Sequence, residues 1–253
     1  MNEINSINNP LIKQIKKILN YKKERLLNNT FILEGTRSIK EAIKSESEII
    51  DIEKIIISST YEKSLNLFDS FEKNIVNHKI FNKISDVKHH QGIMAVVSYK
   101  KNVSLKSNCK KILLLENIND PGNLGTLIRS AAAVSYDAII LTGKCVDYTN
   151  PKTVRASMGT ICLIPIIECS LEKIIEFAKD NYSLVSAVPK NGIPIFDYKF
   201  KEKFILSIGS EAQGLSEKLL EISDAQITIP MSNKVESLNA AVAGSMMMIY
   251  SSK

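Results

Sequence analysis

The side chains best suited to chemistry lie in three loops, and each loop follows an apolar run typical of a buried strand. The first loop follows ILLLE, residues 112–116, and leads into a helix that carries Asn123 and Arg129. Arg129 comes six residues after Asn123, nearly two helical turns later, so we expect the amide and the guanidinium to converge above the start of the helix. The alternative is that Asn123 only caps the helix and that Arg129 pairs with an acid.

The second loop lies within FILSIGSEAQGLS, residues 204–216, between a strand and the start of a helix. Gly209 and Gly214 leave backbone N–H groups open to a ligand, and Glu211 stands between them. Glycine loops at the carboxyl ends of strands are where open α/β sheets bind ligands. We therefore expect this loop to contribute to a binding site.

The third loop follows the run Gln226–Ile229, which ends at Pro230 because proline lacks the N–H that a sheet needs. We expect Ser237 to cap the next helix, with Asn239 beside it at the positive helix end. One helix face is expected to be buried, because apolar residues recur at helical spacing at Leu238, Ala241, Val242, Met246 and Ile249. The alternative is that Ser237 is only a cap, that Asn239 faces water and that the loop is only a connection.

Three such loops after three buried strands indicate a ligand site more strongly than any one loop does alone. Their spacing is not the GxGxxG of dinucleotide-binding folds, and no lysine follows the glycine as it does in a P-loop. A dinucleotide-dependent α/β enzyme is therefore disfavoured.

Strands and helices alternate along the chain, which indicates an α/β fold. We expect an N-terminal domain in residues 1–100, a polar linker in residues 101–111 and a C-terminal domain in residues 112–253. The chain should begin with an amphipathic helix, Ser6–Tyr21, whose lysine-rich face is either simply solvated or contacts phosphates. Further expected elements are strands at Lys54–Ser58, Gly92–Tyr99 and Ile161–Ile167, and helices at Tyr61–Phe71 and Pro151–Ser157.

Composition bounds the class of protein. The 253 residues are 44% hydrophobic and 24% charged, which is ordinary for a soluble globular chain, and the net charge of +6 suits a polyanionic partner without proving one. The four cysteines show no CxxC spacing, and His89 and His90 have no Cys or carboxylate at ligand spacing, so we expect no metal. The sequence has neither a signal-peptide pattern nor a membrane-spanning run, so we expect a cytoplasmic protein without a membrane partner.

The three loops resemble, in order and spacing, the motifs of the SpoU (TrmH-like) family of RNA ribose 2'-O-methyltransferases, within the SPOUT superfamily. The resemblance covers residues 112–250, including NPKTVRASMG at 150–159. The departures are Asn233, where the family usually has glycine, and Ala240 and Ala241 in place of the usual Val and Ser. The first hundred residues resemble, through EGTR and QGIMAVV, the substrate-binding domain similar to ribosomal protein L30e. The matched motif residues are Asn123, Gly125, Arg129, Gly209, Glu211, Gly214, Leu215, Ile229, Pro230, Met231, Ser237, Leu238 and Asn239.

The resemblance implies a C-terminal SPOUT domain with a parallel sheet and a deep trefoil knot, and a small N-terminal α/β substrate-binding domain. It also implies the cofactor S-adenosyl-L-methionine. Backbone groups of Gly209, Ile229 and Leu238 would hold its adenine and ribose, with Met231 and Gly214 as further cofactor-binding residues.

The resemblance further implies a role for each catalytic candidate. Arg129 would polarise the ribose 2'-hydroxyl, because a guanidinium keeps its proton too firmly to be a free base. Asn123 would position the RNA phosphate or Arg129, and Glu211 would orient Arg129 or loop N–H groups. Ser237 and Asn239 would hold the methionine end of the cofactor or the target nucleotide. No metal is required, since a sulfonium is already an activated leaving group.

The implied partners are RNA and a second copy of the chain. Family analogy favours large-subunit ribosomal RNA over transfer RNA, and family members are generally homodimers with the active site close to the subunit interface. Two alternatives keep the same fold. One is a non-catalytic RNA-binding factor in ribosome assembly, and the other is a methyltransferase that confers antibiotic resistance by modifying one ribosomal RNA nucleotide.

Overall fold

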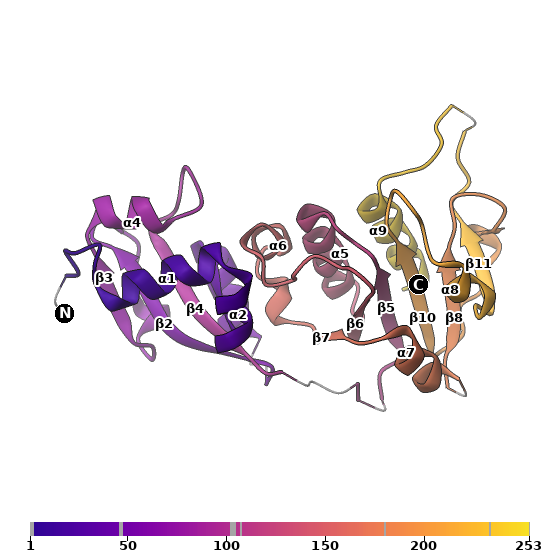
Figure 1. The fold of residues 1–253 in the computed structure, drawn as a ribbon, viewed down its shortest axis with the longest axis horizontal. Helices are drawn as coiled ribbons and strands as arrows, with labels where there is room; N and C mark the ends of the chain where they lie inside the picture. Colours follow the sequence, from indigo (N-terminus) through magenta and orange to yellow (C-terminus); the bar gives the residue numbers. More distant parts are fainter. Residues whose placement is uncertain are drawn as a thin grey trace. The chain divides into compact units, whose positions relative to one another are not determined.

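The computed structural model describes residues 3–45, 48–101, 105–106, 108–179, 181–232 and 234–252. Contacts divide the chain into two compact units, and each unit is a sheet covered by helices (Figure 1). The first unit consists of the residues up to Lys101 together with Asp147–Leu163, and the second consists of the remainder. The segment Asp147–Leu163 therefore packs with the N-terminal part of the chain, although it lies within the stretch predicted as the C-terminal domain.

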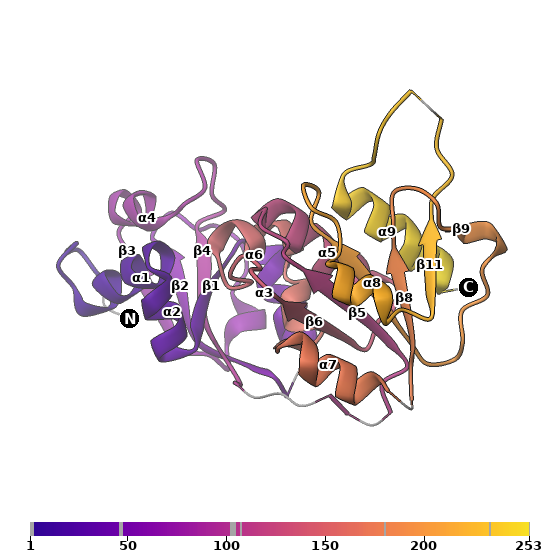
Figure 2. The ribbon, with the colours of Figure 1, turned by 45° about the vertical axis from the view of Figure 1, so that its right-hand side comes forward.

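The first unit contains a four-stranded sheet in the order β1-β4-β2-β3, which Figure 2 shows. β4 is antiparallel to β1 and β2, whereas β3 is parallel to β2. The elements of this unit are α1 (Pro10–Asn20), α2 (Lys22–Asn28), β1 (Thr30–Glu34), α3 (Thr36–Lys44), β2 (Ile50–Ser58), η1 (Asn66–Phe68), β3 (Lys73–Val76), α4 (His78–Ile84), β4 (Ile93–Tyr99), α6 (Pro151–Ser157) and η2 (Thr160–Cys162).

Helix α1 begins at Pro10 rather than at Ser6, because Asn9 accepts a hydrogen bond from the N–H of Leu11 and so caps the helix. Its inner face packs with α4 against one face of the sheet. The apolar stripe expected from the sequence consists of Leu11, Ile15, Ile18 and Leu19. Ile15 and Ile18 are buried, Leu11 and Leu19 are only partly buried, and Ile12 is buried as well. The predicted amphipathic helix is confirmed, with its buried stripe displaced towards Ile12.

Two predicted elements of this unit are wrong. The expected helix Tyr61–Phe71 is reduced to the 3₁₀ turn η1, in a stretch whose Ser, Asn and Asp side chains compete for backbone hydrogen bonds. The expected strand Ile161–Ile167 begins instead as the 3₁₀ turn η2, and only the short strand β7 (Ile166–Glu168), which belongs to the second unit, follows. Pro165 lies within that run and lacks the N–H that a longer strand would need.

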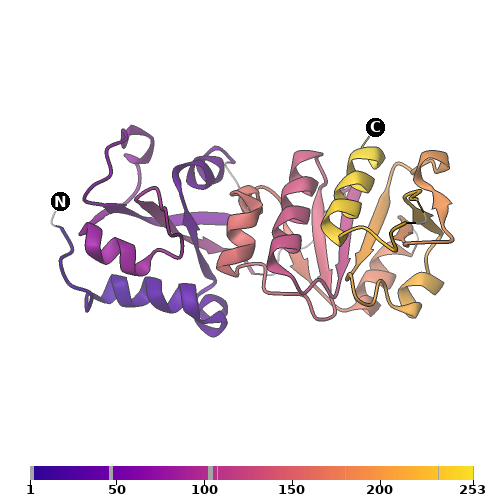
Figure 3. The ribbon, with the colours of Figure 1, turned by 90° about the horizontal axis from the view of Figure 1, so that it is seen from above.

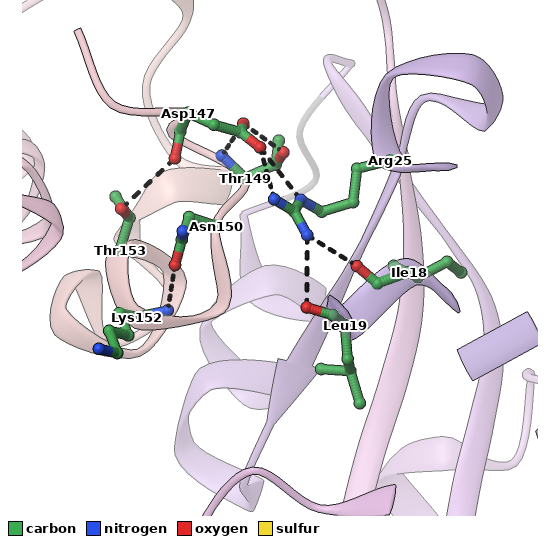
Figure 4. A network of polar contacts seen from close by, with 8 residues as sticks. All are labelled: Ile18, Leu19, Arg25, Asp147, Thr149, Asn150, Lys152 and Thr153. Carbon is green, nitrogen blue, oxygen red and sulfur yellow. Dashed lines mark hydrogen bonds and ion pairs between the residues drawn. The ribbon is translucent and has the colours of Figure 1, made fainter. Parts of the chain in front are cut away.

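A buried ion pair joins the segment Asp147–Leu163 to the N-terminal part of the first unit (Figure 4). The guanidinium of Arg25 donates to the carboxylate of Asp147 at 2.8 and 3.1 Å, and both side chains are 5% exposed. Arg25 also donates to the carbonyl of Ile18, while Asp147 accepts from the N–H and the hydroxyl of Thr149. Every charge in this network therefore has hydrogen-bonded partners, which is the condition for a buried pair to be tolerated.

The second unit contains a parallel sheet in the order β7-β6-β5-β10-β8-β11-β9. Figure 3 shows α5 and α9 together on one face of it. Helices α7 and α8 pack on a core of sheet residues that includes Ile112, Ile140 and Ile205. The deep trefoil knot implied for this unit stays a prediction. Its elements, besides β7, are β5 (Lys111–Glu116), α5 (Pro121–Ala133), β6 (Ala138–Thr142), α7 (Leu171–Ala178), β8 (Ser183–Ala187), β9 (Ile193–Pro194), η3 (Ile195–Asp197), β10 (Phe204–Gly209), α8 (Glu217–Glu221), β11 (Ala225–Thr228) and α9 (Ala240–Ser251).

Of the five residues predicted for the buried face of α9, only Ala241 is buried, and Leu238 is partly buried and precedes the helix. Val242, Met246 and Ile249 are 49%, 45% and 55% exposed, and the helix packs instead through a face that contains Gly244 and Met248. A Cβ at Gly244 would lie 2.5 Å from Leu127 of α5, so the two helices approach closely. Because α9 is apolar on all sides, periodicity could not identify the buried side.

Among the described residues, no helix is long and apolar enough to cross a membrane. Within the same part of the chain, no group of three or more His, Cys, Asp and Glu side chains is arranged to hold a metal ion.

Candidate active site

All three loops predicted from the sequence leave the same edge of the parallel sheet. β10 lies between β5 and β8, with Gly209 opposite Glu116, and β11 pairs with the other side of β8. Because these strands run parallel, the loops that follow Glu116, Gly209 and Thr228 begin at the carboxyl ends of neighbouring strands. This edge is where open α/β sheets bind their ligands.

A cavity of about 500 Å³ opens at this edge, between the loop after β10 and the loop before α9. Apolar side chains of the sheet and of α9, such as Ile208 and Met247, form part of its wall. The structure brings together here all five residues predicted to bind the cofactor, and also Glu211 and Ser237. The five are Gly209, Gly214, Ile229, Met231 and Leu238.

The loop after β10 folds back tightly on itself, and glycine suits it at two positions for different reasons. A Cβ at Gly209 would lie only 2.1 Å from the carbonyl carbon of Gly214, so no side chain fits there. Gly214 has a φ of +68°, in the left-handed region that L side chains rarely adopt. Its N–H donates to the carbonyl of Ser210 at 2.8 Å, which closes the turn over the cavity.

Glu116, predicted only as the end of a strand, holds this loop in place. It is 5% exposed, and its carboxylate accepts hydrogen bonds from the N–H and the hydroxyl of Ser216 at 2.6 and 2.8 Å. The sequence feature that could have indicated its role is a charged residue at the end of an apolar run. We assign Glu116 a positioning role, because it touches the loop and not the cavity.

A polar cluster at the rim of the cavity joins side chains from all three loops. The carboxylate of Glu211 accepts from the amide of Asn123 at 3.0 Å, from the amide of Asn239 and from the N–H of Ala240 at 3.2 Å. Asn239 also donates to the amide oxygen of Asn123 at 3.0 Å. Asn123, Glu211 and Asn239, predicted separately from three motifs, therefore form one hydrogen-bonded group.

The cap of α9 is Asn239 and not Ser237, which corrects the prediction. The Oδ1 atom of Asn239 accepts from the N–H groups of Ala241 and Val242 at 3.0 and 3.1 Å. Asn caps as well as Ser does, and here its amide also bonds to Glu211, so the helix begins two residues later than expected. Ser237 is instead exposed on the cavity wall. Asn233, the departure from the family motif, lies outside the described residues.

Arg129 lies apart from this cluster. Helix α5 begins at Pro121, with Asp120 as its cap, so Asn123 and Arg129 both lie on its helical turns. Six residues turn the side chain of Arg129 roughly 240° round the helix axis from Asn123, so the two leave on different faces. Arg129 is exposed, does not line the cavity and, within the described part of the chain, makes no hydrogen bond or ion pair. The expected convergence of Asn123 and Arg129 does not occur within one chain.

Two charged residues that were not predicted as site residues also line the cavity, Lys190 and Glu236. Lys190 follows β8 and Glu236 precedes α9, and both are exposed. Lys190 lies in a segment without a recognisable motif, so nothing in its surroundings indicated a role. An ammonium and two carboxylates, counting Glu211, give the cavity groups that suit a ligand with charges of both signs.

The protein-family comparison matches nearly the whole chain in two parts. Residues 110–249 match the model of the SpoU rRNA Methylase family, and residues 9–95 match the MRM3-like substrate binding domain. The chain is 31% identical over 254 residues to the 23S rRNA (guanosine(2553)-2'-O)-methyltransferase RlmP of Bacillus subtilis, covering 99% of both chains. It is 32% identical over 253 residues to a Synechocystis protein named as an uncharacterized tRNA/rRNA methyltransferase, covering 97% of this chain and 91% of that protein.

Solved structures show the same architecture. An AdoMet-bound rRNA methyltransferase from Sinorhizobium meliloti has a TM-score of 0.85 and 25% identity, over 99% of this chain and 97% of that one. The SpoU methyltransferase AviRb from Streptomyces viridochromogenes, also in complex with AdoMet, has a TM-score of 0.85 and 22% identity, over 96% of this chain and 97% of that one, and supports the fold. With a family model that spans more than half of its length and a relative matched from end to end, the chain belongs to the SpoU rRNA methylase family.

Proposed function

We propose that this chain uses S-adenosyl-L-methionine to methylate the 2'-hydroxyl of a ribose in ribosomal RNA of the large subunit. The observation that carries the proposal is the cavity at the ends of β10 and β11, whose rim is the cluster of Asn123, Glu211 and Asn239. The name of the Bacillus subtilis relative, which specifies 23S rRNA and a 2'-oxygen, supports both the substrate and the position of the methyl group. Such a function suits a cytoplasmic location, where ribosomal RNA is made in bacteria.

The residues present fit S-adenosylmethionine. A volume of about 500 Å³ lies within the range of small-molecule sites, and the apolar wall suits an adenine ring. The backbone at Gly209 and Gly214 comes close to the cavity because neither residue has a side chain in the way. Lys190 suits the carboxylate of the methionine part, and Glu211 and Glu236 suit its positive charges. When bound, the cofactor supplies a methyl group already activated on a sulfonium.

The chain's own residues then have to bind and orient the sugar. Asn239 is fixed by four hydrogen bonds, two as the cap of α9 and two to Asn123 and Glu211, so its amide is held rigidly at the rim. Glu211 orders the first and third loops, since it accepts hydrogen bonds from both. Arg129 polarises the 2'-hydroxyl, because a guanidinium favours the developing negative charge on the oxygen. Ser237 lies on the cavity wall, where it holds the cofactor or the target nucleotide.

The functional form is a homodimer, with an interface on the exposed face of α9. Val242, Met246 and Ile249 form an apolar strip there, and Phe196, which is 63% exposed, lies beside it. Met246, Ile249 and Phe196 also line a shallow apolar depression of about 220 Å³. A helix that is apolar on all sides needs a second partner surface, and a second copy of the chain would cover the patch symmetrically.

The dimer also supplies a reason for the position of Arg129. Arg129 lies on α5, which packs beside α9, and the hydroxyls of the neighbouring Ser130 and of Ser245 are 2.7 Å apart. An exposed Arg129 next to an interface on α9 is available to the cavity of the partner subunit rather than to its own. The active site is then completed across the dimer.

The proposed function is tested with purified protein, labelled S-adenosylmethionine and ribosomal RNA from a strain that lacks the gene. We expect label in large-subunit RNA, at one ribose mapped by resistance to alkaline cleavage, and loss of label with Arg129→Ala. Label on a base, or none in any RNA while the cofactor still binds, would overturn the proposal. Transfer in the Arg129→Ala variant at the wild-type rate would remove this residue from the mechanism.

A further inference from the structure

The first unit contains a concave site of its own, which shares no lining residue with the cavity at the ends of β10 and β11. It is an open depression of about 570 Å³, formed by α4 and by the loop between α4 and β4. All but one of its lining residues have polar side chains, with three imidazoles, an amide, a hydroxyl and charged groups of both signs. The described residues place no metal-binding group of three His, Cys, Asp and Glu there, so the histidines need another explanation.

Two of these histidines belong to one directional chain of hydrogen bonds. The N–H of Gly92 donates to Nδ1 of His90 at 3.1 Å, so the proton of this imidazole is on Nε2, which donates to Oδ1 of Asn82 at 2.6 Å. The amide nitrogen of Asn82 then donates to Nε2 of His78 at 3.2 Å, and Nδ1 of His78 donates to Thr60 Oγ1 at 2.9 Å. Within this network each imidazole therefore uses one ring nitrogen as a donor and the other as an acceptor.

These hydrogen bonds fix the side chain of Asn82, but they do not use all of its donors and acceptors. An Asn amide has two N–H donors and two oxygen lone pairs. One of each is used towards His78 and His90, so one N–H and one lone pair remain on an exposed side chain. A donor and an acceptor on one fixed amide are complementary to the edge of a nucleobase.

The loop that carries His90 is anchored on both sides of its tip. The hydroxyl of Ser85 donates to the carboxylate of Glu34, and Arg155 of α6 pairs with Asp86 at 2.5 Å. On the far side, the Oε1 atom of Gln91 accepts from the N–H at the start of α3, at 2.9 Å. The depression is therefore formed before any ligand arrives, which reduces the entropy lost on binding.

The charges around the depression favour an anionic ligand. Asp86 is balanced by Arg155, and burial raises the pKa of Glu34 above its ordinary value. Lys88 and His89, at the tip of the loop, are exposed, and neither makes a hydrogen bond or ion pair with any residue that the structure describes. A cation that is free to bind phosphate therefore lies within a few residues of the fixed amide.

From these observations we infer that the depression binds one unstacked nucleotide of the substrate RNA, with the base read by Asn82 and the phosphate held by Lys88. Sequence-specific recognition of RNA generally uses bases that are splayed out of the helix and hydrogen-bonded at their edges. The inference rests on the proposed function for the identity of the ligand. It makes Asn82 a specificity-determining residue that lies in the first unit, outside the methyltransferase motifs.

The test compares Asn82→Ala with Asn20→Ala. Asn20 is also an exposed helical asparagine, and among the described residues its amide bonds only to the carbonyl of Lys16. The probe is protein-free ribosomal RNA from a strain lacking the gene. We expect Asn82→Ala to raise the KM for RNA about tenfold, with kcat and the Kd for S-adenosylmethionine unchanged, and Asn20→Ala to behave as wild type. Lys88→Ala should weaken binding as well and should reduce its dependence on salt.

Asn82→Asp serves as a second variant in case Asn82→Ala fails to fold. It keeps the shape of the side chain and the oxygen that accepts from His90, but it removes both N–H donors. It should also raise the KM for RNA about tenfold. A KM within twofold of wild type for a folded Asn82 variant would overturn the inference. If wild-type protein transfers no methyl group, RNA binding measured by fluorescence anisotropy tests the depression separately from the proposed function, with the same expected order of variants.

Discussion

The side-chain amide of Asn239 donates a hydrogen bond of 3.0 Å to the amide oxygen of Asn123, a residue 116 positions earlier in the chain. Glu211 accepts hydrogen bonds from both amides, so the loops after β5, β10 and β11 meet in one cluster. No single motif contains this arrangement. It arises because β10 lies between β5 and β8 in the sheet, which brings the carboxyl ends of these strands together.

Removing the centre of this cluster should impair catalysis more than folding. We expect Glu211→Ala to lower kcat/KM by about tenfold to a hundredfold, since hydrogen bonds to a charged group each contribute roughly 1.5–3 kcal/mol. Glu211→Gln keeps one acceptor oxygen and should lose less. Steady-state methyl transfer provides the measurement, with Glu217→Ala on α8, an exposed acid outside the cavity, as the control. Normal kinetics in Glu211→Ala would show that the cluster has no part in the reaction.

Gly209 and Gly214 should differ in how they respond to substitution. Gly209→Ala forces a Cβ into the backbone of Gly214, so we expect loss of at least a hundredfold in affinity for S-adenosylmethionine by calorimetry. Gly214 has open space around the missing Cβ and only an unusual φ. Gly214→Asn should therefore cost little, because Asn tolerates this backbone conformation better than other side chains do. The opposite order would mean that the turn is not shaped as described.

Mixing two inactive variants tests whether Arg129 acts across a dimer. In a mixed dimer of Arg129→Ala and Gly209→Ala, one cavity is intact and can receive the intact Arg129 of the other chain. Random mixing should therefore restore about one quarter of the wild-type activity, since half of the dimers are mixed and each has one complete site. Each variant alone, remixed with itself, is the control. If mixing restores nothing although the dimers form, Arg129 acts within its own chain.

Acid should weaken the first unit through His90. Burial, and then the neighbouring His78, keep the pKa of His90 below its ordinary value of 6.5. The unfolded chain therefore takes up this proton at a higher pH than the folded chain does, so the stabilisation is complete above about pH 6.5 and is lost as the pH falls towards the folded-state pKa. Urea unfolding between pH 8 and 5 should show a fall for wild type that is smaller in His90→Gln. Parallel curves for the two proteins would contradict this account.

Breaking the Arg25–Asp147 pair should destabilise the first unit strongly. Asp147→Asn leaves the buried guanidinium without its counter-charge, and losing one partner of a buried pair costs about 3–5 kcal/mol. Lys218→Ala, which breaks an exposed pair with Glu172, should leave the urea midpoint almost unchanged. An Asp147→Asn protein as stable as wild type would mean that water or another group compensates Arg25.

The central strands β5, β6, β8 and β10 of the second unit could be predicted from the sequence because they are largely apolar and buried in a parallel sheet. The short strands β7 and β9 could not, because none of their residues is buried.

Part of the cavity could be predicted as well. Gly209, Gly214 and Glu211 came from the glycine loop at a strand end, and Ile229, Met231 and Leu238 came from the family resemblance. Lys190 and Glu236 could not be predicted, because only the fold places these two exposed charges on the cavity wall. The cap of α9 could not, because Ser237 and Asn239 are equally good capping residues, and only the contact with Glu211 distinguishes them. The sequence also could not show which face of α9 is exposed, since an all-apolar helix gives no periodic signal. Asn82 escaped notice because its importance comes from two histidines that the fold brings to it.

The ion pair between Arg25 and Asp147 bears on how such a protein can be rebuilt. A designer who grafts a new RNA-recognition module at the linker near Lys101 would discard Arg25 and leave Asp147 buried without a counter-ion, in a segment still encoded by the catalytic half of the gene. Chimaeras that fold should therefore exchange Asp147–Leu163 together with the residues up to Lys101, so that both segments of the first unit come from the same protein.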